Sequence, residues 1–152
     1  MNSAPTDTAR PPPISPFLLE LVKNALDTIA DELALIIMRT AFSSIVRDAM
    51  DYSTAICDAQ GHTLAQGLTT PLHLGSFFDA MDNLVRHHAA GAVPGDVFIF
   101  NDPYLAAGQH LPDMYIVRPI FIDGTIEGWA TTVAHLNDIG GIVPGSNSIG
   151  ST

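Results

Sequence analysis

The chain has 152 residues, of which 47% are hydrophobic and 14% are charged, and its formal net charge is −10. This length and apolar content suit one domain with a hydrophobic core and exclude a disordered chain. One lysine and five scattered arginines are too few to neutralise nucleic-acid phosphates or an anionic lipid surface, so both binding classes are excluded. So few charged residues also indicate that part of the surface is covered, by a partner subunit or by a continuation of the chain.

The start of the chain and its cysteine content bear on the compartment. Cys57 is the only cysteine and cannot form an internal disulfide. Residues 1–14 are polar and proline-rich, without the basic and apolar blocks of a secretion signal, and are expected to form a disordered tail. No apolar run reaches the ~18 residues needed to cross a bilayer. We therefore expect a cytoplasmic protein.

The first part of the folded region predicts a long helix followed by a hairpin. Ser15 and the proline after it are a typical helix start, and Ser15 is suited to cap the helix. Apolar residues then recur at three- and four-residue steps over roughly residues 16–43, as on an amphipathic helix. A short β-prone segment at 53–57, a turn, and a return over 62–66 predict an antiparallel hairpin.

The second part predicts another helix and three strands. Helical spacing recurs over residues 72–88, and Gly91 is suited to end that helix. Strands are expected at residues 97–100, 114–122 and 126–134. Asp123-Gly124 is a strong hairpin turn between the last two, and Pro119 indicates an edge or a bulge. The predicted fold class is α+β, with the long N-terminal helix and the second helix packed on antiparallel hairpins.

Two histidines begin the same short pattern, His110-Leu111-Pro112-Asp113 and His135-Leu136-Asn137-Asp138. The proline excludes a regular helix across the first pattern, so its histidine and aspartate are expected on a turn. Antiparallel pairing about Asp123-Gly124 brings together positions whose numbers sum to about 247 or 248. Asp113 then lies opposite His135 or the residue before it. The hairpin is therefore expected to gather His110, Asp113 and His135 at one end of the sheet.

Two imidazoles and one carboxylate make a mixed nitrogen and oxygen ligand set, which suits Mn, Fe, Zn or Co with water in the open positions. A metal held in this way can polarise a carbonyl or activate water. Asp138 is a candidate fourth ligand, an acceptor for a ligand histidine, or a general base. Asp102 is a candidate for orienting a ligand histidine or contacting substrate. The ordinary alternatives are histidines that only form hydrogen bonds and an Asn-Asp-Pro segment that only makes a turn.

Other features favour structural roles. Ser76, in the segment Pro71-Leu72-His73-Leu74-Gly75-Ser76, lies in the first turn of the second predicted helix and is more typical of a cap than of an anion site. Cys57 has no basic neighbour in an apolar strand, so we expect an inert core thiol. The sequence contains no P-loop, Rossmann glycine pattern, nucleophile elbow or cysteine-pair zinc motif, so this chain is not expected to bind ATP.

Several short segments, taken together in their order along the chain, form a specific combination. They include Met38-Arg39-Thr40-Ala41-Phe42-Ser43, Asp51-Tyr52-Ser53, Pro71-Leu72-His73-Leu74-Gly75-Ser76, Asn101-Asp102-Pro103-Tyr104, His110-Leu111-Pro112-Asp113, Ala134-His135 and Asp138-Ile139-Gly140-Gly141. On these segments the chain resembles the hydantoinase B/oxoprolinase family over roughly residues 16–152. That family includes N-methylhydantoinase B-type subunits and related acetone and acetophenone carboxylase subunits.

The resemblance implies a divalent metal, with manganese favoured over zinc or iron, on His110, Asp113 and His135. It implies a hydantoinase A-type partner subunit that binds ATP and phosphorylates a carbonyl or enol oxygen, within a hetero-oligomer. The metal part then completes hydrolysis of a cyclic amide such as a hydantoin or 5-oxoproline ring, with Asp138 and Asp102 as expected catalytic residues. Family chains are much longer, so residues 15–152 are expected to be an incomplete N-terminal part of the domain, inactive alone.

Two alternatives stay open. A subunit of an ATP-dependent ketone carboxylase shares the same site, and the loop at residues 105–109 departs from the family pattern, which leaves the substrate class open. The alternative from another class is a non-catalytic module for ligand binding or subunit contact. It predicts ligand binding without metal.

Overall fold

The computed structural model describes residues 14–73, 75–104 and 110–144. The predicted tail, except for Ile14, and the loop at 105–109 lie outside the described residues. The elements in chain order are α1 (Pro16–Thr40), α2 (Ser44–Arg47), β1 (Tyr52–Asp58), β2 (Thr63–Gln66), the 3-10 turn η1 (Pro71–His73), α3 (Ser76–His88), the 3-10 turn η2 (Ala89–Gly91), β3 (Phe98–Phe100), β4 (Asp113–Ile122) and β5 (Thr125–His135).

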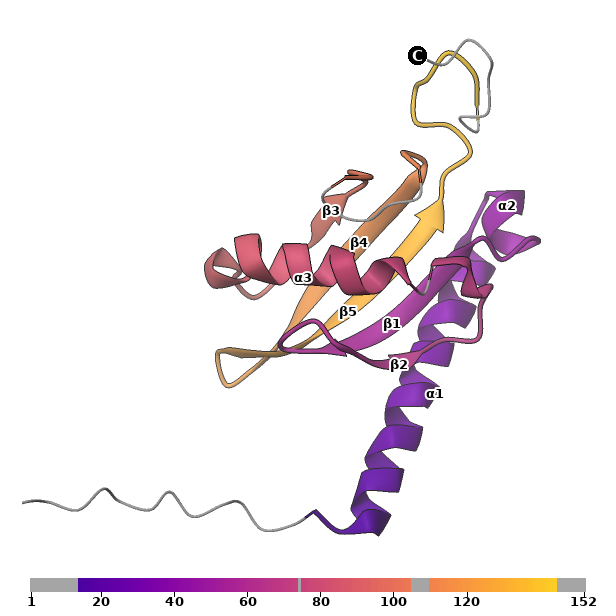
Figure 1. Cartoon of the computed structure of the whole chain (residues 1–152). Helices are drawn as coiled ribbons and strands as arrows, with labels where there is room; N and C mark the ends of the chain where they lie inside the picture. The colour runs from indigo at the N-terminus through magenta and orange to yellow at the C-terminus, as the bar shows by residue number, and fades with distance from the viewer. Residues whose placement is uncertain (1–13, 74, 105–109, 145–152) are drawn as a thin grey trace, which may run out of the picture.

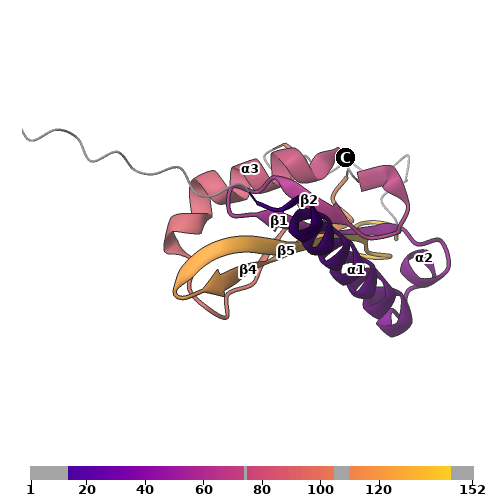
Figure 2. The same ribbon diagram turned by 90° about the horizontal axis from the view of Figure 1, so that it is seen from below.

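The strands form one antiparallel sheet of five, in the order β2-β1-β5-β4-β3. Two hairpins, β1–β2 and β4–β5, are joined side by side through the pairing of β1 with β5. The helices α1 and α3 lie on opposite faces of this sheet (Figures 1 and 2). The α+β prediction, with two helices packed on antiparallel hairpins, is therefore confirmed.

Strand β1 is buried on both faces because a helix covers each one. Toward α1, the Tyr52 hydroxyl donates to the Ala34 carbonyl at 2.8 Å and the Thr54 hydroxyl donates to the Ala30 carbonyl at 3.0 Å. Both helix residues are alanines, whose small side chains let the helix backbone approach the strand. Alternate residues of β1, including Cys57, face α3 instead.

The core on the α3 side combines aromatic residues from the helix and the sheet. Tyr115 lies edge-on to Phe77, with ring centroids 6.1 Å apart, and stacks on Phe100 at 5.2 Å. Trp129 and Met81 are completely buried in the same cluster. The first turn of α3 is thereby held over the end of the sheet where β4 begins and β5 ends.

Three local predictions need correction. The first helix ends at Thr40 rather than near residue 43, because Ala41 turns to an extended conformation and the chain restarts as α2, capped by Ser43. Ser15 precedes α1 but its side chain makes no capping bond. The second helix begins at Ser76 rather than at residue 72, because residues 71–73 form a tighter 3-10 turn.

A register irregularity lies close to Pro119. The β4–β5 pairing shifts between Ile120 and Phe121, one residue beyond the proline. Strand β4 is internal, but β3 pairs only with residues 115–117, so Pro119 lies on a part of β4 that β3 does not pair with. Among the described residues, no helix combines the length and apolar character that a bilayer crossing requires.

Candidate metal centre

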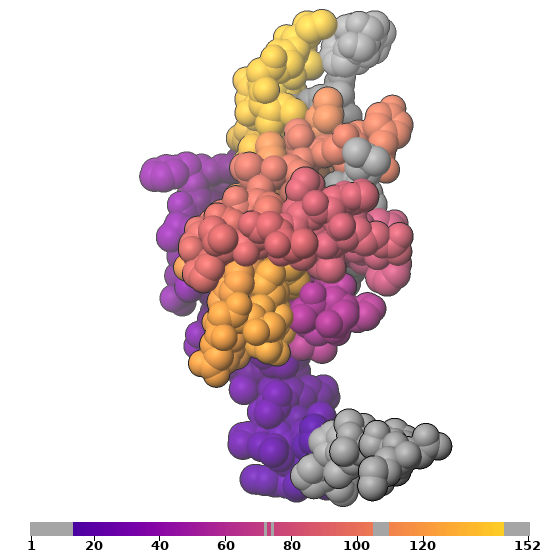
Figure 3. All heavy atoms as spheres, turned by 90° about the vertical axis from the view of Figure 1, so that its left-hand side faces the viewer, coloured from indigo at the N-terminus to yellow at the C-terminus, as the bar shows by residue number. Residues whose placement is uncertain are grey.

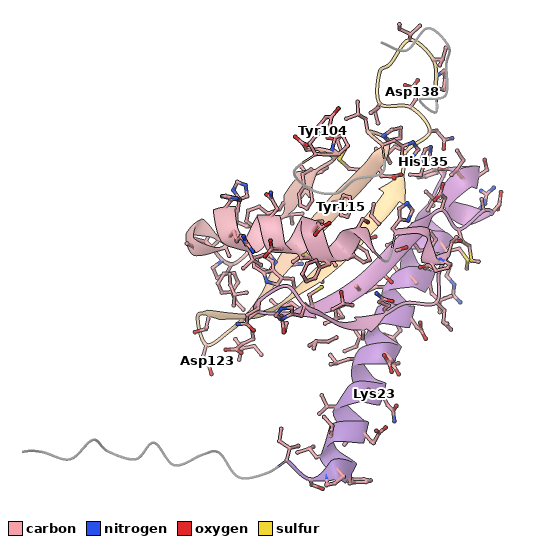
Figure 4. All side chains as sticks on the ribbon, viewed as in Figure 1. Lys23, Tyr104, Tyr115, Asp123, His135 and Asp138 are labelled. Carbon is pink, nitrogen blue, oxygen red and sulfur yellow. The ribbon has the colours of Figure 1, made fainter. Side chains whose placement is uncertain are left out.

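The β4–β5 hairpin sets the position of the predicted ligands. Asp123 and Gly124 adopt positive φ values of 49° and 82°, as the two central residues of a tight hairpin turn do. The ladder runs back from this turn until Asp113 pairs with His135, which confirms the predicted register. Figure 4 shows His135 at the end of the sheet opposite Asp123. Register alone therefore places one carboxylate beside one imidazole.

A turn before β4 brings in the third group. The Asp113 N–H donates to the His110 carbonyl at 3.0 Å, and the Asn101 side-chain amide donates to the Leu111 carbonyl at 2.8 Å. The His110 ring then folds back so that its Nε2 atom lies 3.0 Å from Asp113 Oδ1 and 3.0 Å from His135 Nδ1. His135 Nδ1 lies 3.3 Å from the same carboxylate oxygen. The structure thus brings the three predicted ligand residues together.

The spacing of these three atoms fits one cation. Three ligands at neighbouring corners of an octahedron, each about 2.1 Å from the ion, lie about 3.0 Å from one another. The observed separations of 3.0, 3.0 and 3.3 Å match that arrangement. All three ligand atoms lie within 4.8 Å of one another, at a half-buried His110 and a buried Asp113 and His135. Two imidazoles and a carboxylate in this arrangement suit a divalent transition metal, with open positions left for water or substrate.

Hydrogen bonds among the three residues satisfy these ligand atoms less well than a shared cation does. If both ring nitrogens donate to Asp113 Oδ1, their two hydrogens crowd together at one oxygen, because the nitrogens lie only 3.0 Å apart. If one ring nitrogen is unprotonated, its lone pair lies near the carboxylate oxygen instead. A cation between the three atoms accepts a lone pair from each of them. The residues present therefore fit a bound divalent metal.

Asp113 is nearly fully buried and is surrounded by histidines. Burial is the largest single influence and acts to raise the pKa of its carboxyl group, but the attraction of the neighbouring His73, His110 and His135 together brings the pKa below its ordinary value. The carboxylate is therefore ionised at neutral pH, as a metal ligand must be.

Asp51 is a neighbour of this group that sequence analysis missed. It precedes β1, whose register pairs Tyr52 with Ala134, so Asp51 lies beside His135 and its backbone carbonyl accepts from the His135 N–H at 3.0 Å. Its Oδ1 atom is buried without a hydrogen-bond partner among the described residues. Only the pairing of β1 with β5, between segments far apart in the sequence, brings it here. The segment Asp51-Tyr52-Ser53 was the one local signal.

Comparison with known proteins identifies the family. The sequence model for hydantoinase B/oxoprolinase matches residues 15–152. The chain belongs to the hydantoinase B/oxoprolinase family. The family resemblance stated from the short segments is therefore confirmed.

Two relatives illustrate how this hydantoinase B/oxoprolinase chain compares with longer proteins. It is 36% identical to the caprolactamase β subunit of Pseudomonas jessenii over 131 residues, 86% of this chain and 22% of that subunit. It is 34% identical to the 5-oxoprolinase of Saccharomyces cerevisiae over 134 residues, 88% of this chain and 10% of that enzyme. The chain thus spans at most about a quarter of the length of these relatives.

Two solved structures share the fold of this family member. The crystal structure of the ATP-dependent caprolactamase from P. jessenii superposes with a TM-score of 0.79 at 36% identity, covering 86% of this chain and 22% of the other. A nucleotide-free acetone carboxylase superposes with a TM-score of 0.74 at 24% identity, covering 84% of this chain and 17% of the other. The second likeness shows the fold alone.

The two expected catalytic aspartates of this hydantoinase B/oxoprolinase chain lie in exposed turns. Asp102 follows β3, and its carboxylate accepts from the Tyr104 N–H at 2.7 Å. The Asp138 carboxylate accepts from the Gly140 N–H at 2.8 Å, in a segment beyond the end of the sheet (Figure 4). Neither belongs to the group of three ligand residues found among the described residues. Their catalytic roles stay predictions.

Proposed function

We propose that this chain is the metal-binding part of a hydantoinase B-type subunit in an ATP-dependent enzyme that hydrolyses cyclic amides. The observation that carries the proposal is the convergence of His110 Nε2, Asp113 Oδ1 and His135 Nδ1 at the spacing of one ion's ligands. These three residues hold the metal, and Asp51 lies beside His135 in the neighbouring chain segment. Manganese is favoured, because the family resemblance implies it and a mixed set of imidazole and carboxylate ligands suits it.

The site can act on a carbonyl group. A bound divalent ion supplies a Lewis acid that polarises the amide carbonyl or activates water. His110 forms the solvent side of the group, with 38% of its side chain exposed, whereas Asp113 and His135 lie on its protein side. Substrate therefore approaches past His110, where Asp102 and Asp138 stand in the adjoining turns. We assign these two aspartates to substrate contact and proton transfer.

The partner in this proposal is a hydantoinase A-type subunit that binds ATP, in a cytoplasmic hetero-oligomer. Phosphorylation of the carbonyl oxygen on that subunit makes the ring carbon more electrophilic. Relatives named for lactam substrates, caprolactamase and 5-oxoprolinase, match this chain at 30% identity or more. They favour a cyclic amide of the hydantoin or 5-oxoproline type. The ketone carboxylase alternative uses the same site, and the acetone carboxylase structure, at 24% identity, shares only the fold.

Metal analysis tests the site. We expect purified protein to carry about one equivalent of divalent metal, and His110→Ala or His135→Ala to lose most of it, because each change removes one of three ligands. His62→Ala is the matched control, since His62 is an exposed histidine paired with Asp58 at 3.0 Å outside the site. Stoichiometric metal that survives both ligand changes would remove the assignment. Ligand binding without any metal would instead favour the non-catalytic module.

An activity assay separates the two enzyme classes. The chain is combined with its ATP-binding partner subunit, and ring opening of hydantoin and 5-oxoproline is followed with and without bicarbonate. Ring opening that needs ATP but no bicarbonate supports the amidase. Consumption of a ketone that requires bicarbonate replaces the amidase by the carboxylase. His110→Ala must abolish whichever activity is seen.

A further inference from the structure

His73 lies in η1, directly before α3, and is 1% exposed. Its Nε2 atom lies 3.6 Å from Asp113 Oδ2 and 3.7 Å from Asp51 Oδ1. Both oxygens are buried and have no hydrogen-bond partner among the described residues. One ring nitrogen therefore faces two buried carboxylate oxygens, one from the first residue of β4 and one from the residue before β1. A buried carboxylate oxygen without a hydrogen-bond partner costs free energy, so this arrangement needs a functional explanation.

The two oxygens of Asp113 face different neighbours. Oδ1 lies 3.0 Å from His110 Nε2 and 3.3 Å from His135 Nδ1, on the ligand side. Oδ2 lies on the side of His73. Carboxylates that bind a metal through one oxygen are commonly oriented by a hydrogen bond to the other. The position of His73 matches that orienting role rather than the role of a ligand in the same group.

The ring nitrogen that faces the carboxylates must carry a hydrogen. A lone pair directed at two ionised carboxylates would be repelled, whereas an N–H is attracted to both. Nε2 carries a hydrogen both in the neutral ring protonated on Nε2 and in the charged ring. On its other side, His73 Nδ1 lies 3.4 Å from the Ser53 hydroxyl, which also contacts the Thr70 carbonyl at 3.1 Å. The ring is thus held between a strand and the two acids.

The backbone of His73 is also fixed. The Ser76 hydroxyl donates to the His73 carbonyl at 2.7 Å, and the Tyr115 hydroxyl donates to Ser76 Oγ. Tyr115 lies two residues after Asp113 on β4 and is locked between Phe77 and Phe100. In Figure 4 it lies between the sheet and α3. The strand that carries the ligand Asp113 therefore also positions the turn that carries His73.

We propose that His73 is a positioning residue, which directs its Nε2–H at Asp113 Oδ2 and Asp51 Oδ1 and so holds the Asp113 carboxylate in the orientation needed to bind the cation. The inference rests on the proposed metal site and adds a residue to it. Loss of partners that orient metal ligands commonly lowers metal affinity by about 10- to 100-fold. We expect the same for His73, with the fold retained.

Binding of Mn²⁺ alone tests the inference on the full chain. Free Mn²⁺ is measured by electron paramagnetic resonance during titration of wild type, His73→Gln, His73→Asn and His73→Leu. A glutamine amide nitrogen reaches the position of the imidazole Nε2, whereas an asparagine amide reaches only that of Nδ1. We expect glutamine to keep affinity close to wild type, and asparagine and leucine to weaken it by about 10- to 100-fold. Thermal unfolding of each metal-free variant reports its folding.

The pairing of glutamine with asparagine makes the test decisive. Both variants keep a polar amide, so a purely structural need for a buried polar group predicts equal affinities for glutamine and asparagine. This comparison can be made even if the leucine variant fails to fold. Equal affinities for the two amide variants, or wild-type affinity in a folded leucine variant, overturn the positioning role. His62→Gln is the control for losing a histidine elsewhere. Failure of wild type to bind Mn²⁺, with His110→Ala unchanged from it, would instead overturn the metal site itself.

Discussion

Cys57 shows how the fold controls the chemistry of a single residue. Its thiol is buried in β1 near the Thr63 hydroxyl, and burial raises its pKa to about 11. Thiolate is the reactive form of cysteine, so the folded protein holds almost none of it near neutral pH. We expect no alkylation of the native protein by iodoacetamide at pH 8 and full alkylation in urea. Rapid labelling without urea would contradict the inert role assigned from the sequence.

The same shift gives a pH dependence with a definite sign. The unfolded thiol ionises near pH 8.5, below the folded pKa of about 11, so raising the pH through this interval favours the unfolded state. Below pH 8 the thiol is protonated in both states and has no effect. Urea unfolding at pH 7.5 and pH 10 should therefore show a larger loss of stability for wild type than for Cys57→Ala. Equal losses would show that burial does not oppose ionisation of this thiol.

At the residue scale, sequence analysis identified the candidate ligands, which local geometry brings together. His110, Asp113 and His135 are related by one turn and one hairpin, whose register follows from counting residues on each side of Asp123-Gly124. Asp51 and His73 were missed because they approach through contacts between distant segments. No local pattern specifies that β1 pairs with β5 or that η1 lies over the end of the sheet.

At the element scale, the presence of the two long helices and the hairpins was easier to predict than the ends of the helices or the order of the strands in the sheet. Hydrophobic spacing predicted α1 and α3, and β-prone segments around turn residues predicted both hairpins, since each pattern is local. The short helix α2 was not predicted. The end of α1 at Thr40 depends on Ala41 turning away toward α2, and the start of α3 depends on the tight turn of residues 71–73. Tertiary packing determines these helix ends, and hydrophobic periodicity in the sequence carries no signal for them.

The contact between α1 and the sheet supplies a prediction about an element. A methyl group added at Gly67 would lie 2.6 Å from the Ala30 carbonyl oxygen and overlap the Thr54 hydroxyl, which bonds that same carbonyl. We expect Gly67→Ala to destabilise the fold by about 1–3 kcal/mol, because α1 must move away from β1. Gly91→Ala is the matched control, since a methyl group there meets nothing within 4 Å. Urea unfolding of both variants measures the difference, and equal stabilities would show that α1 does not pack closely at this point.

At the scale of the whole molecule, the low charge content corresponds to a definite surface. One end of α1 extends beyond the sheet (Figure 3), and much of the helix surface is apolar and exposed. The exposed residues of α1 include Phe17, Leu18, Leu19, Leu21, Val22, Ile29, Leu35 and Ile36. The sequence indicated that some apolar surface needs covering, but only the fold shows that it lies on this helix. Contiguous exposed apolar surface of this kind promotes association in water.

This surface predicts how the isolated chain behaves. We expect wild type to self-associate with rising concentration, and a Leu21→Lys, Leu35→Lys double variant to associate less, as measured by sedimentation velocity. Both leucines are exposed, and lysine is a good helix former, so the circular dichroism spectrum should not change. The double variant adds two positive charges, and Glu32→Lys at another exposed position of α1 changes the net charge equally. If Glu32→Lys reduces association as much, charge rather than apolar contact is responsible. If wild type stays monomeric throughout, the apolar surface of α1 does not drive association.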